Sequence, residues 1–157
     1  MVPALLFDLT AIDLTRIVVD AAGIERVNPH RGAMRMLDGI VHADMEKREA
    51  VAYKEVGDDE FWVPGHIPGR PIFPGVLMIE AAAQLASFMA MSLWPNIRFL
   101  GFAAVDGVKF RGQVKPGDRF YILGKGINLR PRRFICAAQG LVNGTMVFEG
   151  QVTGMPL

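Results

Sequence analysis

The stretch VPGHIPGRPIFPGVLMIEAAAQL, residues 63–85, decides how this chain folds. Its first half holds four prolines. Because each proline fixes φ near about −65° and lacks a backbone N–H, this half predicts a stiff loop. The second half is apolar except for Glu80 and Gln84. Pro74 suits the first position of a helix, where a missing N–H does no harm. We therefore expect one long helix over residues 74–93 that ends before the next proline.

The same helix is long and apolar enough to suggest a membrane span. Against this, Glu80, Gln84 and Ser87 lie on one helical stripe, and a charge near the centre of a lone bilayer helix costs roughly 3 kcal/mol. The sequence has no Lys/Arg-rich flank beside the helix and no second candidate span. A helix wrapped by its own protein can be equally apolar, so we expect no membrane insertion.

The rest of the chain has the pattern of strands. Strands are predicted over residues 34–43, 49–56, 97–114, 119–129, 133–142 and 146–153. The turn sequences KPGD (115–118) and Asn143-Gly144 separate several of them. Together these elements predict an α+β domain in which a curved, mostly antiparallel sheet of five to six strands wraps one long central helix. We expect a single domain overall, preceded by a helical N-terminal extension over residues 1–27 whose amphipathic helix covers residues 12–22.

Composition limits the function classes. The net charge of +1 gives no sign of a nucleic-acid-binding tail. The single cysteine, Cys136, cannot form an internal disulfide and fits a reducing compartment. No Lys or Arg precedes the apolar patch at the start, so we expect no secretory signal and a cytoplasmic location. The three histidines have no metal-site spacing, so we expect no metal.

Glu80 is the first candidate for chemistry. A buried carboxylate without a partner is costly, so it must be hydrogen-bonded, paired or face a cavity. One alternative is structural, a pair with Arg70 or Arg98 at a subunit interface. Gln84, one turn further on, either holds the carboxylate in place or satisfies a backbone group.

His66 is the second candidate, although a lone histidine is more often structural than catalytic. It lies in the stiff loop just before the helix start, where the amides of Gly75 and Val76 are free and the helix dipole is positive. Such amides suit a developing oxyanion. A base, a carboxylic acid and an oxyanion donor within one stretch are what proton chemistry next to a carbonyl requires.

The segment HIPGRPIFPGVLMIEAAAQ, residues 66–84, resembles the active-site segment of FabZ-type 3-hydroxyacyl-acyl-carrier-protein dehydratases, a hotdog-fold family with the pattern GHFPxxPxxPGVLxxEAxAQ. The run Asn28-Pro29-His30-Arg31 resembles the PHR element of that family, and residues 101–120 resemble its strand and turn. The likeness covers roughly residues 28–153, so residues 28–157 are identified as a hotdog dehydratase-like domain.

The resemblance implies a hydro-lyase of fatty-acid-type biosynthesis and lipid metabolism that converts 3-hydroxyacyl-acyl carrier protein to the trans-2-enoyl product. His66 would be the general base that takes the C2 proton, Glu80 the acid that protonates the departing hydroxyl, and the Gly75 amide the donor to the thioester carbonyl. No cofactor is implied. Acyl carrier protein is the implied partner, and the family forms homodimers in which His66 of one subunit faces Glu80 of the other, with a trimer of dimers as the larger assembly. His30 is expected to be a structural anchor.

The sequence also departs from the family pattern. Ile67 replaces the usual Phe, and the run after Arg31 lacks the usual aromatic residue and proline. These changes affect the expected acyl tunnel, to which we assign Ile67, Phe73 and Phe110. A group of cationic residues is either a docking patch for an acidic carrier protein or an ordinary solvated face: Lys109, Arg111, Arg130, Arg132 and Arg133. Two other functions remain open, a hotdog thioesterase that uses a carboxylate-activated water and a non-catalytic homologue that binds acyl carrier protein.

Overall fold

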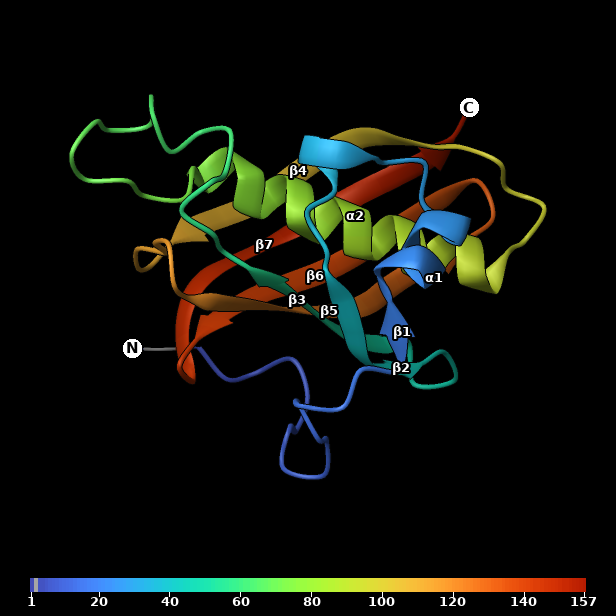
Figure 1. Cartoon of the computed structure of the whole chain (residues 1–157). Helices are drawn as coiled ribbons and strands as arrows, with labels where there is room; N and C mark the ends of the chain where they lie inside the picture. Colours follow the sequence, from blue (N-terminus) through green and yellow to red (C-terminus); the bar gives the residue numbers. More distant parts are fainter. Residues whose placement is uncertain (2) are drawn as a thin grey trace.

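The computed structural model describes Met1 and residues 3–157, and in it one long helix lies against a seven-stranded antiparallel sheet (Figure 1). The strands are β1 (Val19–Asp20), β2 (Gly39–Asp44), β3 (Glu49–Glu55), β4 (Leu100–Phe110), β5 (Arg119–Arg130), β6 (Arg133–Val142) and β7 (Thr145–Pro156), in the order β1-β2-β3-β5-β6-β7-β4. The helices are α1 (Ala21–Val27), a 3₁₀ turn (Gly32–Met34) and the long α2 (Gly75–Leu93). This arrangement confirms the predicted hotdog architecture. The sheet has one strand more than the five to six predicted, because the two-residue strand β1 pairs with β2.

The helix predicted over residues 12–22 is wrong. Asp20 is the N-cap of α1, and its side chain accepts a hydrogen bond from the backbone amide of Gly23. The first helix therefore begins at Ala21, near the end of the predicted range. Upstream, Asp8 and Asp13 accept hydrogen bonds from the amides two residues further on. Such local bonds compete with helix formation. The predicted strand over residues 34–43 starts too early, because residues 32–34 form the 3₁₀ turn.

Helix α2 is buried because the sheet curves around it. Leu85 and Met89 are fully buried, and a Cβ on Gly124 of β5 would lie 3.0 Å from the Met89 sulfur. Glycine at that point lets the sheet approach the helix closely. Within the described part of the chain, α2 is the one helix long and apolar enough to span a membrane, yet 56% of its apolar window is buried inside the protein. Its apolar surface is therefore used in the core.

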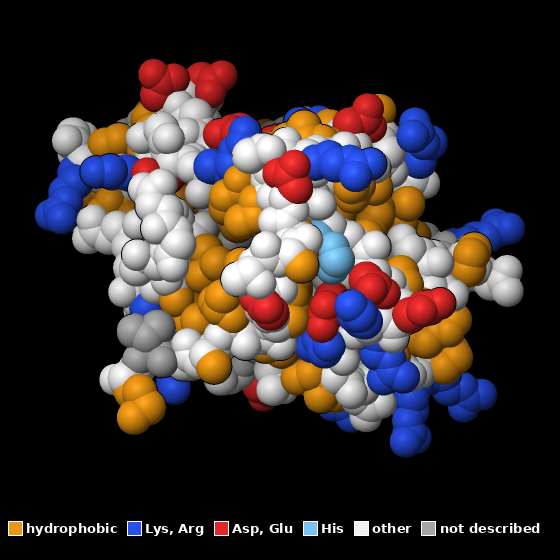
Figure 2. Space-filling model, turned by 90° about the horizontal axis from the view of Figure 1, so that it is seen from below, with side chains coloured by type: hydrophobic (Ala, Val, Ile, Leu, Met, Phe, Trp, Pro, Cys, Tyr) orange, Lys and Arg blue, Asp and Glu red, His pale blue; other side chains and the backbone are white. Residues whose placement is uncertain are grey.

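Residues 3–18 cross the opposite face of the sheet, and we call them the N-terminal strap. The Gln139 side chain of β6 is buried and holds the strap at two points. Its Oε1 accepts from the Leu6 amide at 2.9 Å, and its Nε2 donates to the Ala4 carbonyl at 2.9 Å. A second apolar cluster forms beneath the strap from Leu6, Phe7, Leu9 and Leu14 with Val41, Val51, Tyr53, Tyr121, Leu123, Leu141 and Met146. Seen from the strap side, a patch of apolar side chains lies left of the centre of the molecule, and charged side chains of both signs lie at the left edge and on the right (Figure 2).

The strand β4 forms one edge of the sheet and pairs only with β7 among the described residues. It is eleven residues long, and Phe102 and Phe110 are 53% and 52% exposed. A long edge with exposed apolar side chains is a ready template for pairing with another strand.

Candidate active site

His66 lies in the loop between β3 and α2, and this loop is anchored at several points. Buried Lys54 pairs with Glu60 at 2.8 Å. The carbonyl of Trp62 accepts hydrogen bonds from the amides of Gly65 and His66 at 3.2 and 2.7 Å. The loop therefore holds the His66 backbone in one place, as its four prolines predict.

The ring orientation of His66 determines what it can do. Its Nδ1 lies 2.6 Å from the carbonyl oxygen of Ile72. Because a carbonyl only accepts, Nδ1 must carry the hydrogen, and in the neutral ring Nε2 then keeps its lone pair. The side chain is exposed, so this lone pair is available as a general base.

The residue after the base is held in an unusual conformation. Ile67 has φ +63°, which is rare for a β-branched residue and costs roughly 1–2 kcal/mol. Strain of this kind persists where the surrounding structure imposes it and clusters at functional sites. Ile67 is also one of the positions at which the chain departs from the FabZ-type pattern.

Glu80 lies in the second turn of α2 and is partly buried. Its Oε1 accepts a hydrogen bond from Nε2 of the Gln84 side chain at 2.8 Å and lies 3.6 Å from Nε2 of His30. Among the described residues of this one chain, its polar side-chain partners are thus Gln84 and His30, not Arg70 or Arg98.

Gln84 serves both of the roles considered for it. Besides Glu80, its amide nitrogen donates to the Met34 carbonyl at 2.7 Å, and its Oε1 accepts from the Met36 amide at 2.8 Å. Its own carbonyl accepts from the Asn28 side chain at 2.8 Å. Gln84 therefore orients the carboxylate and also ties residues 28–36 to the helix.

The start of α2 offers free donors, as predicted. Pro74 caps the helix without a side-chain hydrogen bond, and within the described residues the amides of Gly75 and Val76 have no backbone acceptor. A Cβ on Gly75 would lie 2.8 Å from a ring carbon of Phe110, so glycine is needed there. Val76 is 69% exposed. These amides can polarise a carbonyl oxygen placed before the helix.

A cavity of about 60 Å³ adjoins Glu80. Its walls are His30, Glu80, Ala83, Ala86, Ser87, Leu100, Gly101, Phe102, Val152, Thr153 and Gly154. The three residues assigned to the acyl tunnel do not line this cavity. Phe73 is buried in the core, Ile67 is exposed in the loop, and Phe110 lies beside the helix start. The sequence predicted His30 only as a structural anchor and gave Phe102 no role, because both lie far from Glu80 along the chain, whereas Ser87 was already visible on the Glu80 stripe.

Among the described residues, no hydrogen bond or ion pair joins His66 to Glu80. The polar side-chain contact of His66 is with Ile72, and those of Glu80 are with Gln84 and His30. The two candidate residues thus have separate sets of polar partners within the described part of the chain.

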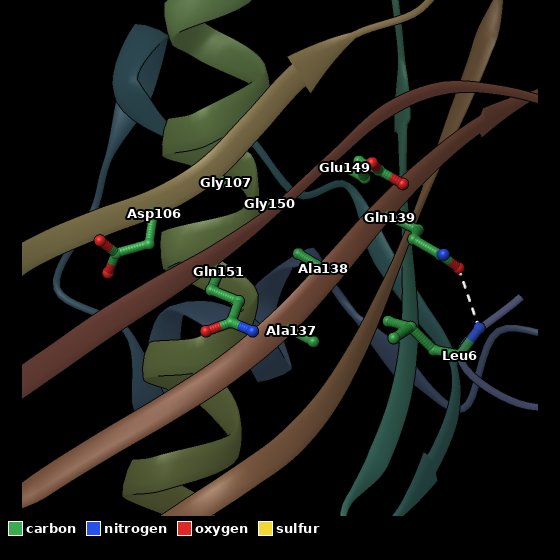
Figure 3. A pocket seen from close by; sticks show the side chains of 9 residues that line it. All are labelled: Leu6, Asp106, Gly107, Ala137, Ala138, Gln139, Glu149, Gly150 and Gln151. Carbon is green, nitrogen blue, oxygen red and sulfur yellow. Dashed lines mark hydrogen bonds between the residues drawn. The ribbon is translucent and has the colours of Figure 1, made fainter. Parts of the chain in front are cut away.

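A larger hollow, about 320 Å³, opens on the strap side of the sheet, with α2 behind the strands (Figure 3). Leu6, Asp106, Gly107, Ala137, Ala138, Gln139, Glu149, Gly150 and Gln151 form its walls. The predicted site residues are not among them. Arg111 donates to Glu149 and holds the pKa of that carboxyl below its usual range, so the main acid here is already paired.

The cationic residues considered as a docking patch or a solvated face lie in two separate groups. Lys109 and Arg111 both contact Glu149, at 3.6 and 2.7 Å. Arg130 and Arg133 flank the β5–β6 turn, at the opposite end of the β4–β7 pair. Because β4 is eleven residues long and a strand rises about 3.3 Å per residue, the two groups cannot form one patch.

The sequence is similar to that of a known family of enzymes over most of its length. Residues 28–151 match the FabA-like domain family. The 3-hydroxyacyl-[acyl-carrier-protein] dehydratase FabZ of Campylobacter jejuni strain RM1221 is 31% identical over 143 residues, which cover 88% of this chain and 97% of that protein. FabZ of Bacillus pumilus is 36% identical over 137 residues, 87% of this chain and 94% of that protein.

Solved structures share the fold at lower identity. The dehydratase heterocomplex ApeI:P from Xenorhabdus doucetiae has a TM-score of 0.73 and 14% identity, covering 85% of this chain and 90% of that chain. A hypothetical thioesterase with coenzyme A from Streptococcus pneumoniae TIGR4 has a TM-score of 0.59 and 13% identity, covering 75% and 84%. Identities this low support the fold alone.

Proposed function

Because the chain belongs to the FabA-like family and is a dehydratase similar to FabZ, we propose that it removes water from a 3-hydroxyacyl thioester on acyl carrier protein. The product is the trans-2-enoyl thioester. The pathway class is fatty-acid-type biosynthesis, located in the cytoplasm. The observation that carries the assignment of roles is the 2.6 Å contact between His66 Nδ1 and the Ile72 carbonyl, which leaves Nε2 as a base.

In the proposed reaction, Nε2 of His66 takes the C2 proton, and negative charge develops on the thioester oxygen. The amides of Gly75 and Val76 stabilise that charge. Glu80 donates a proton from Oε2 to the 3-hydroxyl, the C3–O bond breaks, and water leaves as the C2–C3 double bond forms. Gln84 already bonds Oε1, which leaves Oε2 for the substrate. Return of the proton from His66 to Glu80 closes the cycle.

The working enzyme, in this proposal, is a homodimer paired through β4. Pairing would cover the open edge of the sheet and the exposed rings of Phe102 and Phe110. It would also place His66 of one subunit beside Glu80 of the other, between which no polar contact is present within the described residues of one chain. A trimer of dimers is the larger assembly expected. The arginines at the β5–β6 turn are the candidates for docking the acidic carrier protein.

Enoyl absorbance with a 3-hydroxyacyl substrate tests the reaction. His66→Ala and Glu80→Gln should each remove most of the activity, whereas His42→Ala, a histidine outside the site, should not. Full activity in both site variants would overturn the assignment. Release of free thiol would indicate a thioesterase instead, and binding of acyl carrier protein without turnover would indicate a non-catalytic homologue.

Mixing the two inactive variants tests the shared site. In a two-fold dimer of one His66→Ala and one Glu80→Gln chain, one of the two sites keeps both groups, so random exchange should restore about a quarter of wild-type activity. If subunit exchange is shown by mass spectrometry and no activity returns, the site lies within one chain. The partner of Glu80 would then be sought in its own subunit.

A further inference from the structure

We propose that His30 is a positioning residue for Glu80, donating from Nε2 to Oε1 so that the acid proton is held on Oε2. The inference rests on the proposed dehydration and adds a third group to it. His30 belongs to the Asn28–Arg31 run, which the mechanism above leaves without a role.

The geometry places two donors on one oxygen of Glu80. Oε1 accepts from Gln84 at 2.8 Å and faces Nε2 of His30 at 3.6 Å. The second distance exceeds a hydrogen bond. Catalytic contacts in ligand-free enzymes are often long and tighten when substrate binds. His30 and Glu80 also line the same cavity.

The other ring nitrogen of His30 indicates its tautomer. Nδ1 is buried and has no hydrogen-bond partner among the described residues. A hydrogen on Nδ1 would be a buried donor without an acceptor, whereas a hydrogen on Nε2 faces the carboxylate oxygen of Glu80. Of the two neutral tautomers, the one with its hydrogen on Nε2 is therefore favoured, and that hydrogen faces Glu80.

The backbone around His30 is held firmly. Nη1 of Arg31 donates to the carbonyls of Asn28 and His30 at 2.7 and 2.8 Å, and its Nη2 donates to the Glu25 carbonyl at 2.7 Å. The Asn28 side chain donates to the Gln84 carbonyl at 2.8 Å. The run is thus fixed both to itself and to α2, which sets the ring of His30 beside Glu80.

This arrangement has a chemical consequence. An oxygen that accepts two donors is the carbonyl-like oxygen of a protonated carboxyl, so the acid proton occupies Oε2, the oxygen left for the substrate. When that proton passes to the departing hydroxyl, the same two donors stabilise the carboxylate that remains. His30 should therefore affect the loss of the hydroxyl and not the removal of the C2 proton.

Two substitutions separate this role from a merely structural one. In His30→Leu the donor is lost, and kcat for dehydration should fall at least about tenfold with KM changed less than about twofold. In His30→Gln the amide nitrogen takes the place of Nε2, and most of kcat should return. His42→Leu is the matched control, with kcat unchanged.

The leaving group provides a second readout. A 3-chloroacyl thioester loses chloride, which needs no proton, so elimination depends on His66 but not on the acid. His30→Leu and Glu80→Gln should therefore stay within about twofold of wild type on this substrate, measured above the uncatalysed background. His66→Ala should lose activity on both substrates. Retained chloride elimination also shows that the variant is folded.

The outcomes are distinct. An equal loss of His30→Leu on both substrates, or no recovery in His30→Gln, would show a structural role and overturn the inference. Wild-type dehydration by His30→Leu, with His66→Ala and Glu80→Gln inactive, would also overturn it while leaving the proposed function in place. Full dehydration by His66→Ala and Glu80→Gln would overturn the proposed function itself.

Discussion

Replacing Phe73 by alanine tests whether its ring belongs to the core or to an acyl tunnel. Phe73 is 1% exposed and packs edge-on against Trp62 at 5.6 Å and tilted against Phe120 at 5.9 Å between ring centroids. Truncating such a ring costs the lost transfer free energy plus the cavity, about 3–5 kcal/mol. The two aromatic contacts account for about 0.5–1.5 kcal/mol each. Since a domain has about 5–15 kcal/mol of stability in all, we expect Phe73→Ala to be severely destabilised.

The free energy of unfolding should be measured by urea titration, followed by circular dichroism. Protein concentration must be the same for all variants, because dissociation couples to unfolding in an oligomer. In a thermal scan the loss corresponds to a midpoint lowered by about 10 °C. Phe61→Ala is the matched control. Phe61 lies in the same loop but is 55% exposed, so the change there should stay within about 0.5 kcal/mol.

One result would refute the reasoning. If Phe73→Ala loses less than about 1 kcal/mol and instead accepts longer acyl chains, the ring lines the tunnel, as the sequence analysis predicted.

Three further predictions concern the strap, a buried ion pair and the cysteine. Gln139→Leu removes both hydrogen bonds to the strap. The free energy of unfolding should therefore fall by about 1–3 kcal/mol, and the Leu6 amide hydrogen should exchange with solvent faster. Lys54→Met leaves the carboxylate of Glu60 without its partner and should lower the free energy of unfolding by about 3 kcal/mol. The double variant Lys54→Met/Glu60→Leu should recover most of that stability. Burial raises the pKa of the Cys136 thiol to about 12, so iodoacetamide should react slowly with the native protein through pH 10 and rapidly in denaturant.

Each of these predictions has a contradicting outcome. Gln151, exposed on β7, is the control for Gln139; equal losses in Gln151→Leu and Gln139→Leu would show that the strap bonds do not matter. A Lys54→Met variant as stable as wild type would mean that the pair is already solvated. Labelling of native Cys136 at pH 8 would contradict its burial.

Several elements were predictable because neighbours in sequence determine them. The prolines stiffen the His66 loop, and α2 begins within a residue of Pro74. Val142 pairs with Thr145 across the two-residue turn predicted at Asn143-Gly144, and both turn residues have positive φ, +48° and +75°, as a type I′ turn requires. The wrong prediction at residues 12–22 arose where apolar spacing matched a helix but side-chain bonds of Asp13 favoured a turn.

The sequence by itself determined the stiff loop, the buried helix, the strand pattern and the residue types for proton chemistry, since each depends on steric limits and polarity over a few residues. Only the tertiary structure decided that Phe73 enters the core, that the cationic residues separate into two groups, and that His30 reaches Glu80 across fifty positions. These outcomes depend on which surfaces pack together. Which surfaces pack together depends on how the whole chain buries its apolar residues, and no short stretch of sequence carries that information.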